Sequence, residues 1–180
     1  IRVFIGQALR RKDDVRLPLD YPEIVRWIQD ACDYGKDYGV GVNIETHNQF
    51  DTGKELRRLL DDVNRPNFKV IWDIMHPIEG YEDIETTFEY LKGDISHIHI
   101  TDGTVNPDPM KPQFVYCPIG EGVMPNIELL TLLEKNGYDF YYSLEWEVQW
   151  RESLKNLNMP GREVIANYAK YMNELYAQIK

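Results

Sequence analysis

The stretch FKVIWD at residues 68–73 is a short apolar run that ends in a carboxylate. Because the side chains of a strand alternate between its two faces, Val70 and Trp72 share one face while Ile71 and Asp73 share the other. A parallel strand that is buried on both faces usually reads apolar from end to end. The stretch therefore predicts a buried strand that departs from this rule at its carboxyl end, where Asp73 lies.

Four further runs have the same apolar character, and helical patterns alternate with them. The runs lie at Ile1–Ile5, Val40–Glu45, Ile95–Ile100 and Phe140–Glu145. Apolar residues recur with helical spacing over Pro22–Tyr38, Thr52–Val63, Ile84–Leu91, Pro125–Asn136 and Arg162–Ile179. The alternation predicts an α/β fold with a parallel, helix-covered sheet, either an open doubly wound sheet or a (β/α) barrel. No GxGxxG motif or phosphate loop follows a predicted strand, which weakens the nucleotide-binding version of the open sheet.

Composition narrows the class of protein. The chain has 180 residues, 43% of them hydrophobic, which suits a single domain over residues 1–180. The 30 acidic and 20 basic residues give a formal net charge of -10, which disfavours binding to nucleic acid or to a membrane. No apolar run approaches the roughly 20 residues that span a bilayer. Cys32 and Cys117 are too few for a disulfide framework, so we expect a cytoplasmic setting.

Polar residues stand at the carboxyl ends of four successive predicted strands. They are Glu45, Asp73, His99 and Glu145. In α/β barrels the carboxyl ends of the strands form the active-site mouth, so we expect these four side chains to converge there. No Lys or Arg lies in the same motifs, and carboxylates in contact cannot all stay ionised without a compensating cation. The set therefore predicts a divalent-metal site, for Mn²⁺, Mg²⁺, Co²⁺ or Zn²⁺.

Each of these residues also has a structural explanation when it is taken alone. A single Glu at a strand end is usually a solvated rim residue, and Asp73 could cap the following helix. His99 alone could be a hydrogen-bonded core histidine, which is the interpretation that we favour for His97, one layer deeper in the same strand. The equivalent placement of four such residues favours a shared site.

The sequence around these positions resembles the xylose-isomerase-like TIM-barrel family of sugar isomerases and epimerases, which includes the tagatose and psicose 3-epimerases. The resemblance lies in IETHNQF at 44–50, WDIMH at 72–76, HIHITD at 97–102, GEG at 120–122 and SLEWE at 143–147. It implies that the metal ligands are Glu45, Asp73, His99 and Glu145. It also implies that the residues that contact substrate are His47, His76, Asp102 and Trp146.

The matching motifs belong to the second half of the family's barrel. We therefore expect Ile1–Ile5 to be the fourth strand and the chain to be the C-terminal portion of a (β/α)8 barrel. The first three βα units, about 90 residues, would then be missing, leaving a partial barrel of about five βα units. Such an arc would have two unpaired edges and one open flank, which a second copy could cover in a homo-oligomer.

The resemblance implies a divalent-metal-dependent isomerase or epimerase that acts on a sugar or sugar phosphate. The metal would bind the carbonyl oxygen and stabilise the enediolate that forms when a neighbouring proton is removed. Glu45 and Glu145 would act as catalytic acid and base on opposite faces, and His76 would hydrogen-bond the reacting oxygens.

Three other functions remain open. The first is a hydro-lyase that resembles the inosose dehydratases, and the second is a repair endonuclease that resembles endonuclease IV. The charge of -10 and only four histidines disfavour the endonuclease. The third is a non-catalytic carbohydrate-binding barrel or an inactive fragment.

Several loop residues bear on substrate choice. Some epimerases of this family place an Arg shortly after the seventh-strand His, whereas DGTV at 102–105 offers none. Lys111, further along the loop, could substitute, although loop lysines are usually solvated. The aromatic residues Trp146, Trp150 and Phe114 lie in predicted loops near the mouth, where they would stack on a sugar or close the top of the barrel. Glu147 and Glu152 are expected to be solvated.

Overall fold

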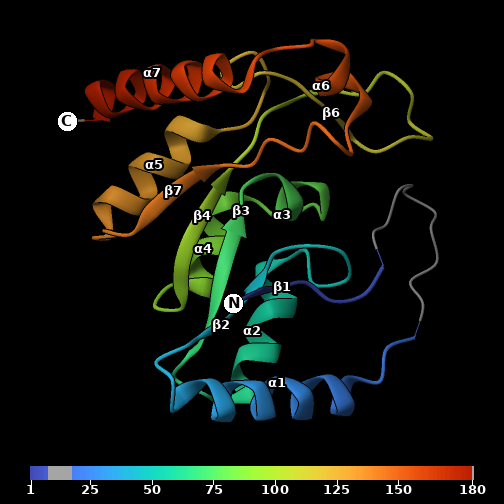
Figure 1. The fold of residues 1–180 in the computed structure, drawn as a ribbon, viewed down its shortest axis with the longest axis vertical. Helices are drawn as coiled ribbons and strands as arrows, with labels where there is room; N and C mark the ends of the chain where they lie inside the picture. The colour runs from blue at the N-terminus through green and yellow to red at the C-terminus, as the bar shows by residue number, and fades with distance from the viewer. Residues whose placement is uncertain (8–17, 180) are drawn as a thin grey trace.

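The computed structural model describes residues 1–7 and 18–179 and contains a parallel sheet of five strands (Figure 1). The strands are β1 Arg2–Val3, β2 Val42–Glu45, β3 Phe68–Asp73, β4 Ile95–Ile100 and β7 Tyr141–Leu144. Their order across the sheet, β1-β2-β3-β4-β7, follows their order along the chain. The predicted α/β fold, a partial barrel with a parallel sheet, is therefore confirmed.

Helices connect the strands and cover one side of the arc. They are α1 Tyr21–Lys36, α2 Gly53–Val63, α3 Met75–Glu79, α4 Ile84–Leu91, α5 Asn126–Lys135, α6 Glu152–Asn156 and α7 Gly161–Ile179. Side-chain caps explain where two of them begin: Thr52 Oγ1 accepts the Glu55 N–H at 3.3 Å, and Asp83 Oδ1 accepts the Thr86 N–H at 2.7 Å. In Figure 1, α1 and α2 lie at one end of the molecule and α5 and α7 at the other.

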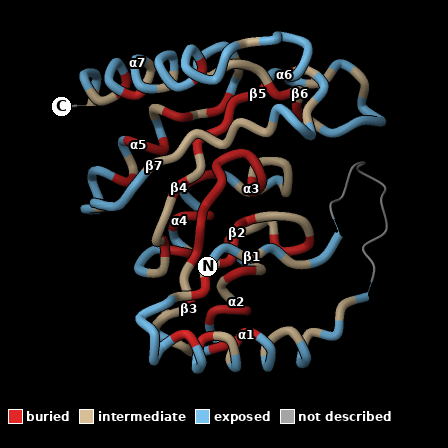
Figure 2. Tube along the Cα trace, viewed as in Figure 1, coloured by how far each residue is buried: buried red, intermediate tan, exposed pale blue. Residues whose placement is uncertain are grey.

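The core follows the predicted alternation of side chains along the strands. Ile44, Trp72 and Ile98 are all fully buried and belong to the apolar face that packs under the helices. Each buried side chain of this size contributes about 1.5–3 kcal/mol relative to an exposed one. Figure 2 shows the buried residues running along β2, β3 and β4, whereas much of α1 and α7 is exposed.

Four short elements were not predicted. They are the antiparallel hairpin of β5 Gly103–Val105 and β6 Phe114–Tyr116, and the short helices α3 and α6. None is long enough to show a clear hydrophobic period, which is the signal that sequence reading relies on. In the part of the chain that the structure describes, no helix has the length and apolar character needed to cross a membrane.

Candidate metal centre

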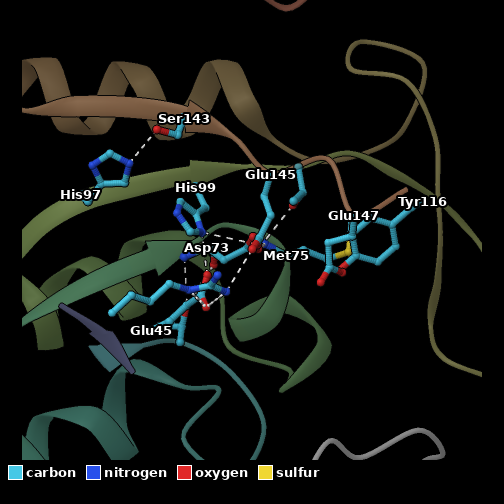
Figure 3. A network of polar contacts seen from close by, with 12 residues as sticks. Glu45, Asp73, Met75, His97, His99, Tyr116, Ser143, Glu145 and Glu147 are labelled. Atoms are coloured by element: carbon cyan, nitrogen blue, oxygen red, sulfur yellow. Dashed lines mark hydrogen bonds and ion pairs between the residues drawn. The ribbon is translucent and has the colours of Figure 1, made fainter. Parts of the chain in front are cut away.

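Four side chains from four different βα units meet at the carboxyl edge of the sheet (Figure 3). Glu45 ends β2, Asp73 ends β3, His99 is the last residue but one of β4, and Glu145 follows β7 directly. One nitrogen or oxygen atom of each lies within 4.8 Å of the corresponding atom of the other three. The structure thus brings together all four residues that the strand-end pattern singled out.

An irregularity in the pairing of β3 with β4 places His99 beside Asp73. Val70 is opposite Ile95, but the register then shifts, so that Asp73 is opposite His99. Ser96 is the extra residue, and its hydroxyl donates to the Val70 carbonyl at 3.0 Å. Without this shift Asp73 would lie opposite Ile98, because a slip of one residue exchanges the two faces of a strand.

The two glutamates are held between an imidazole and a guanidinium. Glu45, which is fully buried, has its Oε1 at 2.6 Å from His99 Nδ1, and its Oε2 accepts from Arg2 Nε at 2.7 Å. Glu145 has Oε2 at 3.4 Å from the same His99 nitrogen, and its Oε1 accepts from Arg2 Nη2 at 3.0 Å. Every carboxylate oxygen of the pair therefore has a polar or charged neighbour.

Asp73 is the member of the cluster with an unsatisfied atom. Its Oδ1 accepts the Met75 N–H at 2.8 Å and the Thr101 hydroxyl at 3.3 Å. Its Oδ2 is buried and has no hydrogen-bond donor among the described residues. A buried carboxylate oxygen without a donor is costly, and a metal ion would satisfy it. The site therefore fits a divalent ion that prefers oxygen ligands with one imidazole nitrogen.

Burial and crowding change the acidity of these groups. Burial, followed by the negative charges of Glu145 and Glu45, raises the pKa of Asp73 to about 7. Burial alone would lower the pKa of His99, but its hydrogen bonds to the two glutamates outweigh burial and raise it to about 9. For Glu145 burial opposes ionisation, yet the His99 hydrogen bond and nearby cations lower its pKa to about 2. With three carboxylates around one imidazole, the cluster favours the binding of a cation.

Two further histidines form a wall beside the cluster. The rings of His47 and His76 meet edge to face with centroids 4.5 Å apart. His76 is buried and its Nδ1 lies 3.3 Å from Glu79 Oε2. His47 Nδ1 lies 2.7 Å from Asn48 Oδ1, and burial lowers the pKa of His47. The charge of Asp73 influences the pKa of His76, which places this imidazole within electrostatic reach of the cluster.

Asp102 is engaged with the backbone of a nearby loop. Its Oδ1 accepts N–H groups of Gly103 at 2.9 Å and Met124 at 3.1 Å, and its Oδ2 accepts those of Gly120 at 2.8 Å and Gly122 at 3.1 Å. A Cβ on Gly122 would lie 2.0 Å from the Asp102 carboxylate, so the GEG motif leaves room for this contact. Asp102 is 4% exposed and lies outside the four-residue cluster, although the sequence suggested that it contacts substrate.

A groove of about 480 Å³ opens beside the cluster. Its lining includes Arg2, His99, Glu145, Trp146, Glu147 and Trp150. This volume is in the range of small-molecule sites. Trp146 is half-buried in the groove, as the sequence suggested for a residue at the mouth, and Trp150 is 75% exposed.

Two sequence expectations about the loops need adjustment. Phe114 is not in a loop at the mouth but lies buried in β6. Glu147 is not solvated, because Arg151 Nε donates to its Oε2 at 2.7 Å and its side chain is 21% exposed. Lys111 is solvated, as is usual for a loop lysine: its side chain is 67% exposed and its Nζ lies 3.8 Å from Asp108 Oδ2.

Arg2 is the residue that sequence reasoning missed at this site. The motifs that carry the four ligands contain no opposing Lys or Arg, whereas Arg2 reaches Glu45 and Glu145 from the first strand. It pairs with Asn43 across β1 and β2, so it lies on the same face as Asn43 and Glu45. A charged residue inside an apolar strand was the available signal.

Comparisons with known proteins agree with the geometry. A family model described as the xylose isomerase-like TIM barrel matches residues 2–174. The chain is 28% identical over 158 residues to a 3-dehydroshikimate dehydratase of Bacillus anthracis, covering 81% of this chain and 55% of that protein. It is 25% identical over 123 residues to a fructoselysine 3-epimerase of Escherichia coli O157:H7, covering 66% of this chain and 42% of the epimerase. The chain thus spans about half the length of the curated relatives it matches.

Among solved structures, the IolI protein with a bound zinc atom superposes with a TM-score of 0.75. The match covers 99% of this chain and 64% of that chain, at 19% sequence identity. At this level of identity the likeness shows the fold.

Proposed function

The chain belongs to the xylose isomerase-like TIM barrel family, and from this premise we propose that it carries the metal centre of a sugar isomerase or epimerase. The reaction would be proton transfer next to a carbonyl group of a sugar or sugar phosphate. Its curated relatives include an epimerase and a dehydratase, and both reaction types are compatible with initial proton removal beside a carbonyl.

One observation supports this proposal above all others: one ligand atom from each of the four strand-end side chains lies within 4.8 Å of the others, and Asp73 of this set has a buried, unsatisfied carboxylate oxygen. The ligands would be Glu45, Asp73, His99 and Glu145. A divalent ion bound there would supply Lewis acidity, polarising a substrate carbonyl and making the neighbouring C–H acidic. Mn²⁺, Mg²⁺, Co²⁺ and Zn²⁺ all accept such a donor set.

The positions of the two glutamates suggest which of them removes the proton and which returns it. Glu145 lines the groove, so its carboxylate is placed to take the proton from the substrate carbon. Glu45 is fully buried against the same His99 nitrogen and would return a proton to the opposite face of that carbon. Return to the opposite face gives epimerisation, whereas return to the adjacent carbon gives isomerisation.

The histidine wall would orient the substrate. In the metal-free protein burial alone would lower the pKa of His76, but Asp73 and Glu79 outweigh burial and raise it to about 9, and even a neutral imidazole carries one N–H. It can therefore donate a hydrogen bond to a substrate oxygen. His47, next to it, would complete this wall, and Trp146 in the groove would stack on an apolar face of the sugar ring.

Dehydration is the second candidate, and a specific observation favours it. The 28% identity to a 3-dehydroshikimate dehydratase extends over 81% of this chain. The same base would remove the proton, after which a hydroxyl on the neighbouring carbon would leave as water. Product mass separates the two reactions, because dehydration lowers it by one water and epimerisation leaves it unchanged.

Hydrogen exchange tests the proposal. The protein is incubated with Mn²⁺ in D2O with a panel of ketohexoses and with 3-dehydroshikimate, and deuterium incorporation and product mass are followed by NMR and mass spectrometry. We expect exchange at the carbon next to the carbonyl, and Glu145→Gln should reduce it by about 10²–10⁴-fold, the usual contribution of a general base. Glu152→Gln, which alters an exposed side chain of α6, is the matched control. Exchange that persists in Glu145→Gln would contradict the assigned role.

A further inference from the structure

We propose that Arg2 is an internal counter-cation of the metal centre, and that a divalent ion must compete with it for Glu45 and Glu145. The inference rests on the proposed metal site and concerns how this chain controls its occupancy. Arg2 would hold the two glutamates in place when no ion is bound, and it would weaken the binding of the ion.

The contacts place the guanidinium between the two glutamates. Arg2 Nε donates to Glu45 Oε2 at 2.7 Å, Nη2 donates to the same oxygen, and Nη2 also donates to Glu145 Oε1 at 3.0 Å. The planar fork of Arg suits this bridging better than the point charge of Lys. Arg2 thus joins residues that come from β2 and from the segment after β7.

Strand pairing, as well as the side chain, fixes this position. Arg2 lies opposite Asn43 in β2, and the Asn43 N–H donates to the Ile1 carbonyl at 2.7 Å. The aliphatic stem then reaches toward Glu45, while the side chain remains 38% exposed on the groove. The guanidinium therefore borders both the buried cluster and the space through which an ion or substrate would enter.

The charges make Arg2 a competitor. In the part of the chain that the structure describes, Arg2 is the one Lys or Arg side chain that contacts the four residues of the cluster. A metal needs an oxygen from Glu45 and one from Glu145, the same two carboxylates that Arg2 binds. An ion in the cluster would also lie near the guanidinium, and like charges repel strongly where water is partly excluded.

Competition has two measurable consequences. Removing Arg2 should strengthen binding of the ion, because the guanidinium then neither repels the ion nor has to be displaced from Glu45 and Glu145. Removing Arg2 should also destabilise the metal-free protein, because among the described residues Glu45 and Glu145 would then have only the His99 imidazole as a cation in direct contact. A residue that merely supported the fold would lower stability without strengthening metal binding.

The experiment makes two measurements on the wild type and its variants. Calorimetric titration gives the Mn²⁺ affinity after EDTA treatment and dialysis, and thermal unfolding in EDTA gives the stability of the metal-free protein. Arg2→Met keeps the apolar stem and removes the charge. We expect Arg2→Met to bind Mn²⁺ at least tenfold more tightly than the wild type and to melt several degrees lower in EDTA. Arg2→Lys keeps the charge but loses the fork, so it should fall between the two in both measurements. Arg26→Met, on the exposed side of α1, removes the same charge away from the site and should match the wild type.

Equal or weaker Mn²⁺ binding by Arg2→Met would overturn the inference while leaving the metal site intact. Binding by neither protein would overturn both the inference and the proposed function. Mn²⁺ binding by Arg2→Met alone would support competition in its strongest form. If Arg2→Met shows no cooperative melting, Arg2→Lys decides: affinity no higher than that of the wild type would refute the proposal.

Discussion

The Thr46 hydroxyl and the Asp73 backbone form a reciprocal pair of hydrogen bonds between the ends of β2 and β3. Thr46 Oγ1 accepts the Asp73 N–H at 2.9 Å and donates to the Asp73 carbonyl at 3.2 Å. Both residues are fully buried, so water cannot replace these bonds. Since Glu45 directly precedes Thr46, this pair fixes two members of the cluster relative to each other.

Replacing Thr46 by Val should therefore affect both stability and metal binding. Val has the same shape but no hydroxyl, so the Asp73 N–H and carbonyl would be buried without partners, at a cost of about 1–3 kcal/mol. We expect a lower urea midpoint with an unchanged slope, together with weaker Mn²⁺ binding. Thr46→Ser, which keeps the hydroxyl, is the control and should retain most of the affinity. Equal Mn²⁺ affinity in Thr46→Val would show that the pair does not position Asp73.

Metal removal provides a direct test of the cluster. An ion that binds the folded state alone raises stability by about 2.7 kcal/mol at a concentration 100 times its dissociation constant, and so raises the melting temperature by about 5–10 °C in a protein of this size. EDTA should reverse the increase. Asp73→Asn should abolish it, because the amide replaces the carboxylate with the unsatisfied oxygen. An undiminished shift in Asp73→Asn would place the ion elsewhere.

Asp102 offers a test that separates a structural role from contact with substrate. Three of its four backbone contacts hold the segment from Gly120 to Met124, and an amide at this position would turn a donor toward some of these N–H groups. Asp102→Asn should therefore lower the free energy of unfolding by about 1.5–3 kcal/mol, the range for hydrogen bonds to a charged group. Glu121→Gln, exposed in the same loop, should change it little. Unaltered stability combined with weaker substrate binding would restore the expectation from the sequence.

Acid should selectively remove the contribution of Asp94, which joins α2 and β3. Its Oδ2 accepts from Arg57 Nη1 at 2.9 Å, and its Oδ1 accepts from Lys69 Nζ at 2.6 Å. Burial favours the neutral acid, but the hydrogen bonds to Lys69 and Arg57 outweigh burial and hold the pKa of Asp94 below its usual value. The ionised form therefore stabilises the fold above the unfolded pKa of about 3.9, and this contribution is lost as pH falls through the lower folded pKa.

Asp94→Asn should thus cost about 1–2 kcal/mol at pH 7 and less at pH 3. Urea unfolding of both proteins at the two pH values measures the difference. A gap that stays constant between pH 7 and pH 3 would contradict this account.

The alternation of side chains between the two faces of each strand was the main sequence feature that predicted the site. The alternation within FKVIWD identified Asp73 as the residue that breaks an apolar face, and the same reasoning found its three neighbours in the cluster. The alternation of side chains within a strand gives no information about contacts between elements that are distant in sequence. Arg2 is one example, since its charge reaches the cluster only through pairing of β1 with β2. Asp102 is another, since its partners lie across a loop whose path no local pattern encodes.

The extra residue at Ser96 has a consequence for how such a centre can tolerate length changes in its own strand. The register shift at Ser96 determines which side chains of β4 lie on the same face of the sheet as Asp73 at the carboxyl edge. Deleting one residue there would exchange imidazoles for isoleucines in that row while leaving composition almost unchanged. Which side chains face the metal centre thus depends on the register of β4. Homologous chains should accept insertions far more readily in the loops than between Ile95 and His97.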